Sequence, residues 1–109
     1  MTAHLIYSTW PGATEAELCA AQLIERRLAA CVTVVPAAHS TFRWEGQVQR
    51  STEAIMLVKT TNLQSRAVLE AVRAAHPYDL PCILAFAVSA EGSNPDFLQW
   101  VATETTSAA

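Results

Sequence analysis

The feature that most limits the fold of this chain is a pair of β-rich segments separated by a single Glu45-Gly46 step. A two-residue step ending in glycine between such segments predicts a hairpin turn. Its arms, residues 31–44 and 47–60, hold 14 residues each and would reach roughly 45 Å at about 3.3 Å per residue. A domain of 109 residues has a radius of gyration of about 13 Å, so it is roughly 35 Å across. We therefore expect the outer half of the hairpin to leave its own domain and lie on a second copy of the chain.

The base of this hairpin is apolar and its outer part is polar. Near the base, the valines of the segment 32–35 face the apolar run 54–58, so both faces of the strands need cover. Pro36 cannot donate to a strand ladder and predicts a bulge, a bend or an edge position. The outer part holds Phe42 and Trp44 on one face among polar residues, namely Arg43, Glu45, Gln47, Gln49, Arg50, Ser51 and Thr52.

Composition favours a globular protein that hides part of its surface in an oligomer. The length predicts one domain over residues 1–109, and the chain is 51% hydrophobic but only 16% charged. Its formal net charge is −3 and its seven basic residues form no cluster, which excludes nucleic acid as an expected partner.

The same composition predicts a soluble, cytoplasmic protein with no membrane partner. No apolar stretch is long enough to span a bilayer, and the N-terminus lacks the pattern of a signal peptide. The three cysteines are widely spaced and odd in number, so they indicate a reducing compartment rather than a disulfide framework.

The remaining segments predict an alternation of strands and helices. A strand over 4–10 precedes a helix that starts at the capping-box pattern Thr14-x-x-Glu17 and runs to about residue 30. After the hairpin, Thr61-x-x-Gln64 predicts a second helix to about residue 75, followed by a strand over 82–90. The strand's alternating small residues predict close packing against helices, and Asn94-Pro95 starts a last helix. The order βαββαβ plus one helix predicts an α+β, ferredoxin-like sandwich with a four-stranded antiparallel sheet.

Five motifs in this order resemble the CutA family, which is named for divalent-cation tolerance. The resemblance covers about residues 4–101 and implies a tight homotrimer of ferredoxin-like subunits whose long hairpins pair between neighbours. It also implies a structural similarity to PII signalling proteins, which bind effectors in clefts between subunits. The motifs are Leu28-Ala-Ala-Cys31-Val with Pro36, Ser40-x-Phe42-x-Trp44-Glu-Gly46, Glu53, Lys59-Thr60, and His76-Pro-Tyr78-x-x-Pro81.

A metal site is the first functional candidate because the family name implies one. The resemblance implies a copper site made by a thiol late in the first strand and paired histidines before Pro-Tyr. Ser8 and Ala75 occupy two of these positions here, which leaves His76 as the candidate ligand for copper or another divalent cation. The alternative is that His76 closes a helix C-terminus. None of the potential ligands shows the short spacing of a zinc site: His4, His39, His76, Cys19, Cys31, Cys82, Met1 and Met56.

A second candidate is a polar cleft between subunits formed by Glu53, Lys59, Tyr78 and Trp44. A buried Lys59 ammonium would need a carboxylate, and Glu53 of the same strand or of a neighbouring subunit is the candidate partner. The set would either accept a small anion or serve as a structural ion pair that fixes the hairpin register. Trp44 is expected to anchor a subunit interface.

An enzymatic function is not expected. Cys31 invites a nucleophile role with His76 as base, but a buried small hydrophobic role is favoured for all three cysteines. The chain has no Gly-rich phosphate loop, nucleophile elbow or acid–base pair, and no organic cofactor is expected. The resemblance to the CutA family therefore implies a homotrimeric cation-tolerance protein that binds metal weakly or between subunits. The alternatives are a PII-like effector-binding module and a purely structural trimer.

Overall fold

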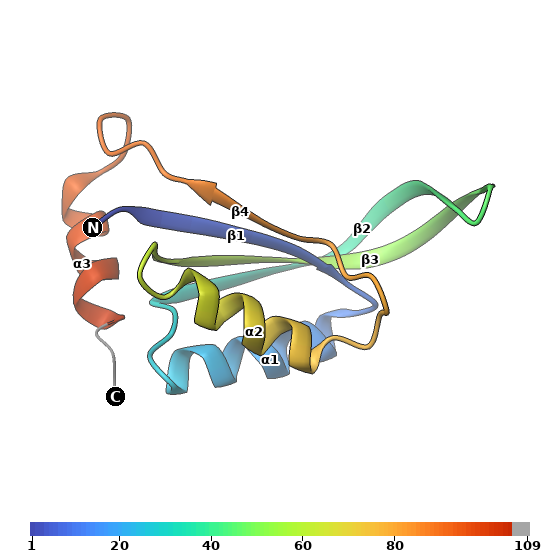
Figure 1. Ribbon diagram of the computed structural model, residues 1–109, viewed down its shortest axis with the longest axis horizontal. Coiled ribbons are helices and arrows are strands. Elements are labelled where there is room, and N and C mark those ends of the chain that lie inside the picture. Colours follow the sequence, from blue (N-terminus) through green and yellow to red (C-terminus); the bar gives the residue numbers. More distant parts are fainter. Residues whose placement is uncertain (106–109) are drawn as a thin grey trace.

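The computed structural model describes residues 1–105 and shows a two-layer body from which one hairpin projects (Figure 1). Along the chain the elements are β1 (Ala3–Trp10), α1 (Ala13–Glu25), β2 (Cys31–Trp44), β3 (Gln47–Thr61), α2 (Ser65–Ala75), β4 (Ile83–Ala87) and α3 (Pro95–Glu104). The expected order is confirmed. Its longest dimension is 44 Å, against 30 and 21 Å for the other two, because the outer halves of β2 and β3 extend beyond the body.

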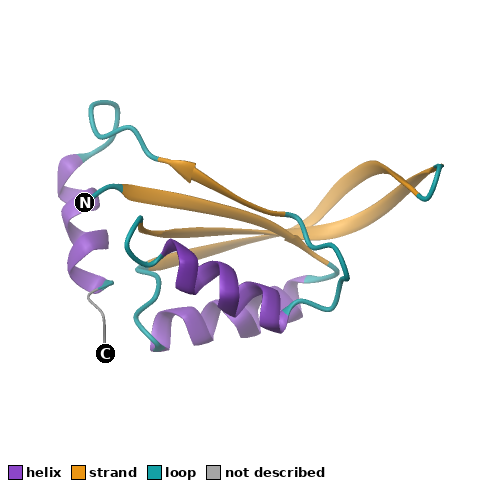
Figure 2. Ribbon diagram, in the orientation of Figure 1, coloured by secondary structure: helices purple, strands orange, loops and turns teal. Residues whose placement is uncertain are grey.

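The four strands form one antiparallel sheet in the order β2-β3-β1-β4. Both βαβ units therefore interleave as the ferredoxin-like prediction requires. Helices α1 and α2 lie side by side over one face of this sheet (Figure 2), while α3 stands at its end beside the start of β1. The predicted fold class is confirmed.

The core lies between the sheet and helices α1 and α2. Alternation along β3 directs Ala54, Met56 and Val58 to the helices, and these three side chains are fully or almost fully buried. They meet Leu23 from α1 and Val72 from α2, which are fully buried as well. Burial of these apolar side chains is what holds the helical layer on the sheet.

The hairpin has the turn and the bulge that the sequence predicts. Glu45 and Gly46 both have positive φ angles, 50° and 79°, as a type I′ turn requires. The register shifts between Val35 and Ala38, so Pro36 lies in a bulge. The extra residue reverses the alternation of β2. As a result, the even-numbered residues of its outer half join the sheet face that carries Val35.

The second face of the sheet is apolar and carries no helix within residues 1–105 (Figure 2). Paired residues share a face, and the register places Phe86 of β4 beside Leu5 of β1, which in turn lies beside Lys59 of β3. Exposed fractions on this face are high for apolar side chains: Val35 42%, Phe42 41%, Trp44 42%, Leu84 52% and Phe86 49%. We call these five residues the open-face apolar set. An apolar surface of this extent indicates an interface.

Both predicted capping boxes are wrong. Helix α1 begins at Ala13 after Gly12, and α2 begins at Ser65 after Gln64; neither cap makes a side-chain hydrogen bond. Thr14 and Thr61 lie one residue inside α1 and four before α2, so their hydroxyls are misplaced for capping. The predicted cap at Asn94 is confirmed, because its Oδ1 accepts the backbone N–H of Asp96 at 3.0 Å.

Helix α1 ends five residues before the predicted end at residue 30. Arg27 has a φ of 58°, its N–H donates to the carbonyl of Ile24, and the N–H of Leu28 donates to the carbonyl of Leu23. This is a Schellman motif, which usually holds glycine where this chain has Arg27. The sequence signal for a helix end was therefore missing.

Strand β4 is shorter than the predicted 82–90, and of its residues on the helical side only Ile83 packs against the core, so close packing of helices along the whole strand is not found. Ala85 and Ala87 point to the helical side of the sheet but are exposed. The helices cover β1, β2 and β3, and they stop short of this edge (Figure 1).

Candidate functional site

A group of polar and aromatic side chains in mutual contact lies where the hairpin leaves the body. Trp10 ends β1 and is fully buried; its indole N–H donates to the Ser8 hydroxyl at 2.8 Å. His76 follows α2 and packs on Trp10 with ring centroids 4.3 Å apart, and Tyr78 packs on His76 at 4.8 Å. Glu53 completes the group from β3. We call Trp10, His76, Tyr78 and Glu53 the hairpin-base cluster.

Both ring nitrogens of His76 are occupied within the described chain. Its Nε2 lies 2.7 Å from the carbonyl oxygen of Thr9, and its Nδ1 accepts the backbone N–H of Tyr78 at 3.2 Å. The two bonds together select the neutral tautomer with the proton on Nε2. His76 is 8% exposed, so water has little access to the ring. The side chain thereby ties the end of α2 to the end of β1.

These contacts decide how well the predicted metal site fits. A metal ligand needs a free lone pair, and the Nδ1 lone pair of His76 is already used. The Ser8 hydroxyl, at a position where the resemblance implies a thiol, accepts from Trp10. Residues 1–105 also contain no group of three or more histidine, cysteine or acidic side chains that could hold a metal ion. The hairpin-base cluster, as folded in one chain, does not fit a copper ion at His76.

Glu53 and Tyr78 form the polar end of the cluster. The Tyr78 hydroxyl donates to Oε2 of Glu53 at 3.1 Å. Glu53 as a whole residue is only 8% exposed. Burial, the hydrogen bond to Glu53, and the charges of Glu53 and Glu15 raise the pKa of Tyr78. The phenol therefore stays a donor, and it stabilises a carboxylate that is largely removed from water.

The structure separates Lys59 and Trp44 from this cluster. Lys59 donates to the Thr33 hydroxyl at 2.5 Å, and its Nζ lies 3.7 Å from the Cys31 sulfur. It lies six positions along β3 from Glu53, a distance of roughly 20 Å. The predicted ion pair within one strand is therefore wrong, and the pairing with a neighbouring subunit stays a prediction. Trp44 ends β2 opposite Gln47, near the tip of the hairpin.

The three cysteines differ in their surroundings. Cys19 is buried in the core, and burial raises the pKa of its thiol, as a small hydrophobic residue would show. Cys31 is half-buried beside Lys59, and Cys82 is exposed. The prediction of a buried role is confirmed for Cys19 and wrong for Cys82.

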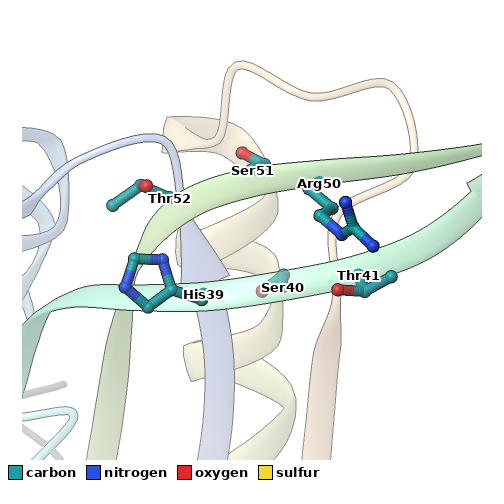
Figure 3. Close-up of a pocket in the computed structure, with 6 residues that line it drawn as sticks. All are labelled: His39, Ser40, Thr41, Arg50, Ser51 and Thr52. Carbon is teal, nitrogen blue, oxygen red and sulfur yellow. The ribbon is translucent and has the colours of Figure 1, made fainter.

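Sequence reasoning missed two parts of the site. Trp10 and Glu15 were treated only as parts of a strand and a helix, and the chain fold alone brings them to the hairpin base. A groove of about 470 Å³ on the outer hairpin was also missed (Figure 3). The run of polar residues on the two paired outer strands was the available signal for it. The groove is lined by His39, Ser40, Thr41, Arg50, Ser51 and Thr52.

Comparison with known proteins decides the family. The sequence profile of the CutA1 divalent ion tolerance protein family matches residues 4–104, almost the whole chain. This chain belongs to the CutA1 family. The divalent-cation tolerance protein CutA of Thermus thermophilus is 41% identical over 102 residues, which are 94% of this chain and 97% of that protein. The CutA homolog of Xenopus laevis is 38% identical over 95 residues, which are 87% of this chain but only 62% of the frog protein.

Solved CutA1 structures have the same fold. The CutA1 crystal structure from Oryza sativa superposes with a TM-score of 0.92 at 32% identity, covering 99% of this chain and 97% of the rice chain. The PII-like protein CutA from Nostoc sp. PCC 7120, in its apo form, superposes with a TM-score of 0.88 at 25% identity, covering 95% and 98%. Within residues 1–105, no helix of this CutA1 chain is long and apolar enough to cross a membrane.

Proposed function

We propose that this chain acts as a homotrimer in tolerance to divalent cations and that it is not an enzyme. One observation carries the proposal: the open-face apolar set runs from the edge strand β4 across the sheet and onto the outer hairpin. Within residues 1–105 of a single copy no helix or strand covers this surface, and the hairpin extends away from the body (Figure 1). Neighbouring copies that exchange hairpins supply the missing cover.

The assembly is tested by molar mass in solution. Multi-angle light scattering at micromolar concentration is expected to give three times the 11.8 kDa mass of the chain. A monomer at that concentration would contradict the proposal. The tolerance function is tested in cells that lack their own CutA protein, grown in raised copper with and without this chain. Equal growth in both cultures would count against the tolerance function.

The metal part of the proposal concerns sites between subunits rather than His76. Because Thr9 and Tyr78 already occupy both ring nitrogens, His76→Gln is expected to change the Cu(II) dissociation constant less than about twofold. Isothermal titration with Cu(II), and with Cu(I) under reducing conditions, measures this. A loss of about tenfold or more in the variant would show that His76 is a ligand after rearrangement.

A PII-like effector-binding module is the second candidate function, and Lys59 favours it. Its ammonium lies on the open face and contacts only a hydroxyl and a thiol among the described residues, so it has no carboxylate to neutralise it. Packing of open faces would bring this charge, with Glu53, Tyr78 and Trp44, into a cleft between subunits. The similarity of this chain to the Nostoc protein, which is described as PII-like, supports the same candidate.

The effector candidate predicts that small anions stabilise the protein through Lys59. Nucleotides or organic acids at about 100 times their dissociation constant should raise the unfolding free energy by about 2.7 kcal/mol, visible as a higher Tm. Lys59→Gln should remove this shift because the cation that attracts the anion is lost. A thermal-shift screen compares the two proteins. A shift that persists in Lys59→Gln would exclude this cleft as the binding site.

A further inference from the structure

The outer hairpin has one face that carries basic groups and no carboxylate. The register pairs His39 with Thr52 and Thr41 with Arg50, and side chains of such pairs lie on the same face. Figure 3 shows Arg50 and Thr41 side by side on the hairpin, with His39 further along the same strand. Arg43 pairs with Val48 and continues this face toward the turn. Alternation puts Glu53 on the opposite face of β3.

Arg50 is the cation of this face that lacks a partner in the described chain. The Arg43 guanidinium donates to the Gly46 carbonyl at 3.3 Å, within its own turn. The Arg50 side chain forms no hydrogen bond or ion pair within residues 1–105, where the ion pair found is Arg66–Glu70 at 3.8 Å. Its planar guanidinium is suited to bind a carboxylate through two parallel hydrogen bonds.

Glu53, in contrast, is an acidic residue that lacks a cationic partner in the described chain. The Glu53 residue is 8% exposed, and its carboxylate receives one hydrogen bond, from Tyr78, but no cation of the described chain forms an ion pair with it. Glu15 adds a second negative charge near Tyr78. A largely buried carboxylate is costly unless a cation or several donors compensate it. The hairpin base therefore carries an uncompensated negative charge.

Arg50, which lacks an anionic partner, and Glu53, which lacks a cationic one, cannot pair with each other within one chain. Arg50 and Glu53 are three residues apart on β3, so their side chains point to opposite faces and start roughly 10 Å apart along the strand. We infer that Arg50 of one copy binds Glu53 of the neighbouring copy, so that the basic face of each hairpin closes the hairpin-base cluster of the next subunit. This inference depends on the proposed homotrimer. A contact between two different patches repeats head to tail, which is how a cyclic trimer closes.

Such a contact changes what the hairpin-base cluster does. The cation that it binds is a guanidinium of the assembly, so the cluster fixes the position of the incoming hairpin. Trp10 packs on His76, and His76 packs on Tyr78, which holds the Tyr78 ring in place. The Tyr78 hydroxyl donates to Oε2 of Glu53 and so fixes the orientation of the carboxylate. The open groove seen on the isolated hairpin is then the surface that the neighbour covers.

A double-mutant cycle tests the pairing. Arg50→Gln and Glu53→Gln keep most of each side chain's volume and remove its charge, and the glutamine at position 53 can still accept from Tyr78. Each single variant is expected to lower the Tm of the trimer by about 5 °C or more, and the double variant by no more than the larger single effect. Light scattering on every variant confirms that the trimer is what melts.

Matched controls make every outcome decisive. Arg73 lies exposed on α2, so Arg73→Gln combined with Glu53→Gln should give additive shifts. Additive shifts for positions 50 and 53, or an unchanged Tm in Arg50→Gln, overturn the pairing while the trimer itself stands. If inorganic phosphate raises the Tm of the wild type but not of Arg50→Gln, the groove binds a small anion instead and the pairing is again overturned. A wild-type monomer refutes the homotrimer, and the pairing falls with it.

Discussion

Replacing Phe86 by aspartate is expected to dissociate the proposed trimer into folded monomers. Phe86 belongs to the open-face apolar set and is 49% exposed in the single chain, so the chain does not need it to fold. In the proposed assembly, loss of a buried aromatic contact would cost about 2 kcal/mol or more at each interface, and a buried unpaired carboxylate would add to that cost. Light scattering should show the mass falling to 11.8 kDa, with an unchanged far-UV circular dichroism spectrum.

The control for this variant is Leu18→Asp. Leu18 is 66% exposed on α1, on the helical side of the molecule, and the same kind of substitution there should leave the trimer intact. If Phe86→Asp also remains trimeric, the open face is not the interface and the proposed assembly is wrong. If both variants dissociate, the interface includes the helical layer, and the role given to the open face does not hold.

The hairpin could be predicted from the sequence, but the exposure of the open face of the sheet could not. The lengths of the two hairpin strands, the Glu45-Gly46 turn and the bulge at Pro36 follow from local rules, and all three are confirmed. The exposure of Leu84 and Phe86 could not be predicted in the same way. Alternation along β4 tells which residues share a face, but not whether helices cover that face. The end of α1 was missed for a local reason, since Arg27 adopts a conformation usually given to glycine.

The sequence predicted which residues belong to the candidate site better than it predicted how they are arranged. Glu53 and Tyr78 do lie together, because the loop after α2 returns to the base of the hairpin. Lys59 was grouped with them by chemistry alone, yet strand spacing already placed it roughly 20 Å away. For His76 the sequence left a metal ligand and a helix-end residue as alternatives, and no pattern shows that Thr9 and Tyr78 use both its nitrogens. The contact with Thr9 joins segments 67 residues apart, which no local pattern can reveal.

Truncating Trp10 is expected to cause the largest loss of stability of any single substitution in the hairpin-base cluster. The side chain is fully buried, packs on His76, and satisfies its indole N–H with Ser8. Trp10→Ala leaves a cavity and should cost about 3–5 kcal/mol, whereas Trp10→Phe keeps a ring and should cost about 1–2 kcal/mol. Guanidinium denaturation at fixed protein concentration, followed by circular dichroism, measures both values.

The pattern of these losses tests whether the cluster acts as one unit. His76 positions Tyr78, so a cavity at Trp10 should also weaken the hydrogen bond between Tyr78 and Glu53. The effects of Trp10→Ala and Tyr78→Phe should then fall short of additivity by about 0.5 kcal/mol or more. Trp100→Ala is the control, because this side chain is 44% exposed on α3, remote from the cluster, and should add to Tyr78→Phe independently. Full additivity with Trp10→Ala would mean that the aromatic stack supports the core alone and does not orient the carboxylate that we expect the neighbouring hairpin to bind.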